Sequence, residues 1–278
     1  MHDKAEQFIQ TVMTALNQEQ LLLPSLPEIA LKVRKECEKE DSSAEHIAEL
    51  LLNDASLSVK LLQVANSSFY KINVETSDIK MAITRLGLHQ VKSLVISLAM
   101  KQLYQASTDI LRERFRELWL SSVKTATLCR MLCSHINHLD KEQAMLAGLT
   151  HSIGALPVLL MAESDEELLN NAQALITVTQ QAQGKIGECI FRKWNFPEYM
   201  IQMANECYDF KRSHEGPADY LDVLQVALVE GSIYTGLECP DDWSEIPAFK
   251  KLGINTDVNF LDIEDNKLTF EETEALLK

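Results

Sequence analysis

Apolar residues recur at helical spacing along almost the whole chain, and the alternation typical of β-strands is nearly absent. Each helix in such a chain must bury an apolar stripe, so the sequence favours a packed assembly of helices. Only nine glycines and seven prolines occur among 278 residues. Leu, Ala, Glu, Gln and Lys, which lose little on entering a helix, are frequent. The predicted fold class is all-α.

Capping residues divide this periodic sequence into separate helices. The first helix lies within residues 1–19, and Pro27 is expected to be the first residue of the second. Ser42 and Glu45 match a capping box at the start of the third. Further helices are predicted at 56–65, 78–87, 88–104, 110–138, 141–149, 165–179, 186–194, 197–209, 219–234 and 247–252.

The chain is strongly acidic, with a formal net charge of −15 and a sequence pI near 4.9. The electrostatic field of so acidic a protein repels polyanions, so nucleic acid is not expected as a partner. The densest basic run is Arg112, Arg114 and Arg116, which alternate with Glu113 and Glu117. Alternating charges are typical of a solvated helix face with internal ion pairs.

Cysteine usage and hydropathy both indicate a cytoplasmic protein. The six cysteines are scattered through helical sequence, which favours reduced thiols over a disulfide framework. The N-terminus MHDKAEQFIQ lacks the basic start and apolar middle of a signal peptide. The apolar stretch 146–162 is interrupted by polar residues, Gly and Pro. We therefore expect no membrane association.

Seven segments, spaced along most of the chain, form one recognisable pattern. In the first half these are LLPSLPEIA (22–30), NDASLSVKLLQVANSSFY (53–70), DIKMAITRLG (78–87) and VKSLVI (91–96). In the second half they are LWLSS (118–122), AGLTHSIG (147–154) and WNFPE (194–198). In this order, the segments resemble the HD-related output domain (HDOD) family of bacterial signalling proteins.

The resemblance implies a helical domain over residues 20–215, with subdomains at 20–105 and 106–215. The second subdomain would be related to HD-type metal phosphohydrolases. A helix in residues 1–19 precedes this domain. Residues 216–278 are expected to form C-terminal helices and an acidic tail, packed on the HD-like part.

HD enzymes hold metal ions with His and Asp side chains, and the metal activates water for attack on phosphorus. At the positions where the resemblance places these ligands, the chain has a single histidine, followed by a serine where the signature aspartate belongs. The position of the late aspartate corresponds to Leu228. Apart from Leu228, the residues at the ligand positions are Ser121, His151, Ser152, Gln183, Cys207 and Tyr208, and they would form a vestigial pocket.

A divalent ion needs several ligands at once, so we expect no metal, no cofactor and no catalytic residue here. His151 is interpreted as a buried imidazole bonded to helix carbonyls, the alternative being a ligand-binding group. Cys129, Cys133, His135 and His138 have a composition that suits zinc, but core cysteines are favoured because ligands on one helix do not converge.

The loop at Asn66, Phe69 and Tyr70 is a candidate partner surface. Its Asn and Ser side chains can cap helix ends and its aromatic side chains can anchor the turn, which is the structural alternative.

Together these observations predict a non-catalytic signal-transduction module that binds a partner protein of unknown identity or a small ligand. One alternative is a metal-dependent phosphohydrolase or phosphodiesterase with an altered ligand set around His151. The other is a nucleotide sensor without catalysis.

Overall fold

The computed structural model describes residues 2–67, 70, 75–105, 108–232, 240, 242–256, 270–271, 274–275 and 277. Within these ranges the regular structure is helical and contains no β-strand, which confirms the predicted all-α class. Three groups of helices follow a first helix, α1 (His2–Asn17).

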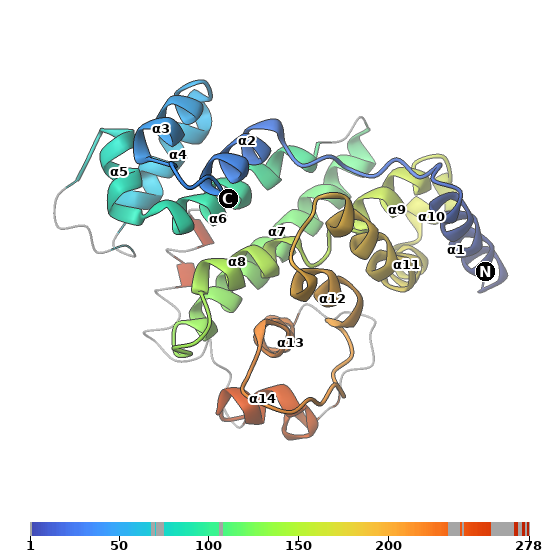
Figure 1. Cartoon of the computed structure of the whole chain (residues 1–278). Coiled ribbons are helices and arrows are strands. Elements are labelled where there is room, and N and C mark those ends of the chain that lie inside the picture. Colours follow the sequence, from blue (N-terminus) through green and yellow to red (C-terminus); the bar gives the residue numbers. More distant parts are fainter. Residues whose placement is uncertain are drawn as a thin grey trace.

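The N-terminal group lies at one end of the molecule (Figure 1). It contains α2 (Glu28–Cys37), α3 (Ala44–Leu52), α4 (Ala55–Asn66), α5 (Ile79–Leu86), α6 (Leu88–Met100) and the 3-10 turn η2 (Lys101–Leu103).

The central group contains α7 (Asp109–Cys133), α8 (Lys141–Thr150), α9 (Ala155–Ala162), α10 (Glu166–Asn170), α11 (Ala172–Lys193) and α12 (Glu198–Glu206). The last group is α13 (Tyr220–Glu230), the 3-10 turn η3 (Trp243–Glu245) and α14 (Pro247–Leu252). Helix α13 packs against α7 and α8, and α14 packs against α13.

Several of the predicted helix boundaries were wrong; α6, for example, ends at Met100 and α12 at Glu206. Pro27 is the N-cap of α2 and not its first residue. The third helix is capped by Ser43, because it starts at Ala44 and only the Ser43 hydroxyl reaches the backbone N–H of His46, at 3.2 Å. Helix α7 ends at Cys133, so the residues up to 138 form turns.

The predicted helices at 165–179 and 186–194 are also wrong in extent. Asp165 caps the short helix α10, and Asn171 caps α11, which then runs unbroken to Lys193. Helix α11 packs along both α9 and α12, and this tertiary contact sustains the helix through residues 180–185, where no helix was predicted.

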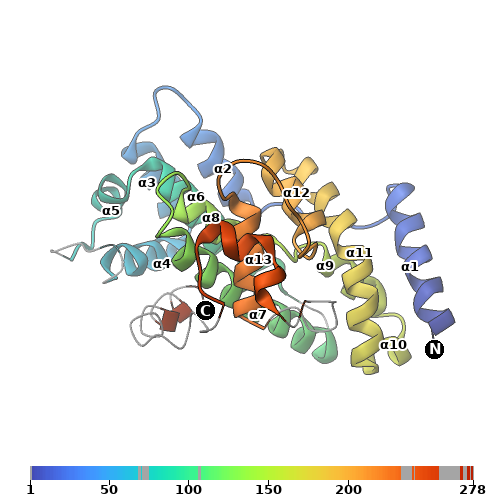
Figure 2. The same cartoon turned by 90° about the horizontal axis from the view of Figure 1, so that it is seen from below.

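Helix α1 packs on α11 at the opposite end of the molecule from α3–α5, as both views show (Figures 1 and 2). An extended segment then leads to α2. The indole N–H of Trp194 donates to the Pro24 carbonyl across 3.1 Å, and Arg34 donates to the Trp194 carbonyl at 2.6 Å. The motifs at 22–30 and 194–198 therefore contact each other and join the N-terminal and central groups.

A buried ion pair joins α7 to α8. Arg130 donates to one carboxylate oxygen of Glu142 through Nε at 3.0 Å and through Nη2 at 2.7 Å. Their side chains are 2% and 0% exposed. The guanidinium carbon lies 5.2 Å from the centre of the Tyr70 ring, which extends the contact to the N-terminal group.

The segment Lys141–Ala162 is long and apolar enough for a membrane-spanning helix, which the sequence analysis did not expect. However, 89% of its most apolar window is buried within the fold, and a turn at 151–154 divides it into α8 and α9. Most of its apolar side chains are part of the core, while Leu160 is exposed.

Removing one partner of the Arg130–Glu142 pair leaves a buried, uncompensated charge, which costs about 3–5 kcal/mol. We therefore expect Arg130→Met to lower the free energy of unfolding by about this amount in urea denaturation. Arg116→Met, which breaks an exposed pair with Glu113 on the same helix, should cost less than about 1 kcal/mol. Equal effects of the two substitutions would contradict this assignment.

Candidate functional site

The turn between α8 and α9 lies unusually close to α11. A Cβ atom on Gly154 would come within 1.9 Å of the Gln183 carbonyl oxygen and 2.6 Å of the Gly187 nitrogen. Only glycine fits such a backbone contact. The Ile-Gly pair at 153–154 thereby positions His151 and Ser152 against Gln183.

A pocket of about 250 Å³ opens at this contact, and we call it the HD-type pocket. Five of the six residues predicted for the vestigial site line it: Ser121, His151, Ser152, Gln183 and Tyr208. The sixth, Cys207, is fully buried in the core beside Tyr208 and is not among the lining residues.

His151 is held in one tautomer. Its Nδ1 lies 2.7 Å from the Gly148 carbonyl oxygen, which can only accept, so Nδ1 carries the proton. The side chain is buried, and this desolvation lowers its pKa from 6.5 to about 4, with the Gly148 bond opposing the shift. The imidazole is therefore neutral at pH 7, with Nε2 as an acceptor.

The phenol ring of Tyr208 meets His151 edge-on, with ring centres 6.2 Å apart. Burial raises the pKa of Tyr208 far above its usual value, although a hydrogen bond with Gln183 opposes this. Burial also raises the pKa of Cys207 to about 12. Both groups are protonated at neutral pH, so neither supplies a nucleophile or an anionic ligand.

Ser152 is linked to residues that the sequence analysis did not select. Its hydroxyl lies 2.9 Å from that of Ser122, and the two share a hydrogen bond. The Tyr104 hydroxyl lies beside both serines, and burial raises the pKa of Tyr104 to about 12. Because Tyr104 comes from the N-terminal group, no spacing within the central group could have predicted this contact.

Charged groups at the HD-type pocket are paired with each other. Arg114 donates to Glu117 at 3.0 Å, and the Glu117 side chain is 52% exposed. The remaining polar donors and acceptors are hydroxyls, amides and one imidazole. This set does not fit a catalytic divalent ion, which requires several carboxylate or imidazole ligands.

Among the described residues, three potential metal ligands converge only at His214, Asp219 and Asp222. The cationic side chains of Arg212 and Lys251 already contact this cluster. Arg212 donates to Asp219 at 2.6 Å and to Asp222 at 3.4 Å, while Lys251 lies 2.8 Å from His214. The cluster is a capping arrangement for α13, with Asp219 as its N-cap.

The other residues considered for metal binding have structural contacts. Cys129 and Cys133 are buried, and burial raises the pKa of both thiols. His138 lies beyond the end of α7, and one of its ring nitrogens is 2.8 Å from the Ala218 carbonyl. Leu228 is fully buried in the core on α13.

The candidate partner loop is only partly described, because Phe69 lies outside the described residues. The Asn66 side chain bonds both the carbonyl and the amide of Thr76, at 2.8 and 2.9 Å. Burial raises the pKa of Tyr70, and the Glu142 charge adds to the effect. Asn66 and Tyr70 thus have internal roles, and recognition through Phe69 stays a prediction.

Comparison with known proteins identifies the family. The HDOD domain pattern matches residues 23–210, and the chain belongs to this family. A crystal structure from Shewanella amazonensis SB2B, provisionally named a metal-dependent phosphohydrolase, is similar with 27% identity and a TM-score of 0.88. The match covers 99% of this chain and 100% of that one.

Two further proteins resemble the chain less closely. A structure from Marinobacter aquaeolei VT8, provisionally named a signal transduction protein, is 17% identical with a TM-score of 0.60, covering 99% of this chain and 65% of that one. The cyclic di-GMP phosphodiesterase CdgJ of Vibrio cholerae is 26% identical over 46% of this chain and 28% of its own length. The chain spans less than half the length of the curated relatives it matches.

The Gly154 contact gives the first prediction for this site. Gly154→Ala forces the α8–α9 turn away from α11 and should lower the free energy of unfolding by about 3 kcal/mol. Gly184→Ala on α11 is the control, because its nearest contact would be 3.1 Å and the helix gains propensity. Urea denaturation that ranks the two variants in the opposite order would refute the close crossing.

The buried His151 should also make stability depend on pH. The unfolded chain takes up a proton near pH 6.5 and the folded chain only near pH 4, so stability is lost as pH falls between these values. Between pH 7 and pH 5, the wild type should lose about 2 kcal/mol more than His151→Gln. Parallel pH profiles for the two proteins would exclude a neutral, desolvated His151.

Proposed function

We propose that this chain is a non-catalytic signal-transduction module of the HDOD family, which acts by binding a partner protein or a small ligand. One observation carries the proposal. At the HD-type pocket, the side chains that surround His151 are the hydroxyls of Ser121, Ser152 and Tyr208 and the amide of Gln183. These groups form hydrogen bonds but do not replace metal-binding carboxylates.

The chemistry of the pocket suits a small polar ligand. Neutral His151 offers an acceptor at Nε2, while Tyr208 and the serine hydroxyls can donate or accept. A volume of about 250 Å³ admits a small molecule but is too small for a folded segment of a partner. Ligand binding here would change the contact between α9 and α11, and a partner protein could sense that change.

A second candidate is a phosphodiesterase with an altered ligand set. One feature favours it, because an imidazole whose Nδ1–H bonds a carbonyl presents Nε2 in the way that metal-ligating histidines do. A distant relative is also named a cyclic di-GMP phosphodiesterase. The scarcity of further ligands leads us to prefer the binding role.

We also propose that the protein acts in the cytoplasm. The described cysteines, Cys37, Cys129, Cys133, Cys189 and Cys207, are all free thiols, as a reducing compartment requires.

An assay of phosphodiester hydrolysis tests the proposed non-catalytic role. Purified protein in excess Mn²⁺ should hydrolyse neither bis(p-nitrophenyl) phosphate nor cyclic di-GMP above the rate without enzyme. Preparations of His151→Ala should be indistinguishable from wild type in this assay. Metal-dependent turnover that His151→Ala abolishes, while Ser164→Ala on the surface retains it, would establish the phosphodiesterase instead.

A further inference from the structure

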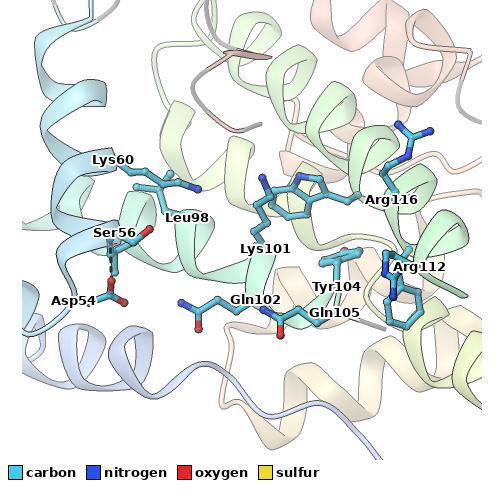
Figure 3. A pocket seen from close by; sticks show the side chains of 13 residues that line it. Asp54, Ser56, Lys60, Leu98, Lys101, Gln102, Tyr104, Gln105, Arg112 and Arg116 are labelled. Carbon is cyan, nitrogen blue, oxygen red and sulfur yellow. Dashed lines mark hydrogen bonds between the residues drawn. The ribbon is translucent and has the colours of Figure 1, made fainter. Parts of the chain in front are cut away.

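A second and larger pocket, of about 400 Å³, lies between the N-terminal and central groups of helices (Figure 3). We call it the basic pocket. Its walls come from the start of α4, the end of α6 with η2, and the first half of α7. The HD-type pocket shares none of its lining residues, although Asp54, Ser56, Leu57, Lys60 and Trp119 lie within the family-like segments 53–70 and 118–122.

The charge of this pocket is opposite to that of the chain. Four cationic side chains line it, with Asp54 as the single carboxylate, in a protein of net charge −15. Asp54 is committed to the N-cap of α4, where it accepts the Leu57 N–H at 3.0 Å. The cations are Lys60, Lys101, Arg112 and Arg116.

Lys60 of α4 and Lys101 of η2 project into the pocket from different helices, as Figure 3 shows. The pKa of Lys60 is lowered, first by partial burial and then by the positive charge of Lys101. Like charges brought together in a partly buried cavity repel each other. An anion bound between them would be attracted by both charges.

The two arginines form surface ion pairs in which another anion can replace the carboxylate. Arg112 pairs with Asp109 and Arg116 with Glu113, one turn away along α7. Both arginine side chains are about 60% exposed, and such surface pairs are weak in water. Arginine binds phosphate through two parallel hydrogen bonds, so a phosphate group can replace these carboxylates.

The pocket also has an aromatic wall formed by Tyr104, Phe115 and Trp119. The rings of Tyr104 and Trp119 pack edge to face, with their centres 5.0 Å apart. Trp119 is 5% exposed, and its indole N–H has no hydrogen-bond partner among the described residues. An unpaired buried donor at a cavity wall is costly unless a ligand accepts its hydrogen bond.

We infer that the basic pocket binds a nucleotide, with the phosphates among Lys60, Lys101, Arg112 and Arg116 and the base against the aromatic wall of Tyr104 and Trp119. The pocket volume lies in the range of small-molecule sites. This inference does not depend on the proposed function of the HD-type pocket.

Helix α7 separates the two pockets. It presents Arg112, Phe115, Arg116 and Trp119 to the basic pocket, and Arg114, Glu117, Leu118 and Ser121 to the HD-type pocket. Each set follows the i, i+3, i+4, i+7 spacing of one helix face. Tyr104 of the basic pocket also lies beside Ser152 of the HD-type pocket, so a bound nucleotide would contact a wall that both sites share.

Isothermal titration with ATP, GMP and pyrophosphate, each in EDTA, tests this inference. We expect at least one nucleotide to bind at least about tenfold more tightly than pyrophosphate, since only nucleotides use the aromatic wall. Lys60→Gln combined with Lys101→Gln should weaken nucleotide binding at least about tenfold. Lys80→Gln, at an exposed lysine on α5, should leave it unchanged.

A second readout does not depend on removing charge. Nucleotide binding should change the tryptophan fluorescence of the wild type, and Trp119→Phe should lose most of this change while Trp243→Phe retains it. The inference is overturned if no nucleotide binds at millimolar concentration, if pyrophosphate binds equally well, or if the lysine double variant, folded by circular dichroism, binds like wild type.

Discussion

The buried contact between α7 and α8 determines how the surrounding helices α6, α9 and α13 are arranged. These two helices form the most extensive helix pair among the described elements, and the Arg130–Glu142 ion pair lies inside their contact. A buried pair of this kind tolerates little displacement, because either charge alone would be strongly unfavourable. The pair holds the first turn of α8 against α7, and the close approach of Gly148 to Ala126 continues this contact towards the turn that carries His151 and Ser152.

From this fixed turn, the fold builds two sites of different chemistry on opposite faces of α7. The HD-type pocket is small and almost neutral, with a desolvated imidazole and protonated phenol and thiol groups. The basic pocket is larger and cationic. The HD-type framework thus surrounds a set of hydrogen-bonding groups, and this is why we propose a binding role for it.

Much of the fold could be predicted from the sequence, because helix caps and apolar spacing are local. Asp78 and Gly87 bound α5 as expected, and the all-α class followed from periodicity. The errors arose where tertiary contacts determine how far a helix extends. At Gly184, packing against α12 keeps α11 helical through a polar stretch. Family spacing also placed five of six expected residues around one pocket.

The parts that could not be predicted depend on contacts between distant segments. Arg112 and Arg116 have the alternating charges of a solvated helix, and their exposed ion pairs fit that interpretation. Only the fold brings Lys60 from α4 and Lys101 from η2 opposite them. Likewise, no local pattern indicates that Tyr104 lies beside Ser152.

The claim that the HD-type pocket does not hold a catalytic ion can be measured directly by titrating Mn²⁺ into the pure protein and following the electron paramagnetic resonance of the free aqueous ion. We predict that nearly all of the signal persists when protein and Mn²⁺ are equimolar, because a single imidazole among neutral hydroxyls and amides does not hold this ion against water. Stoichiometric loss of the signal, restored by His151→Ala, would contradict the account.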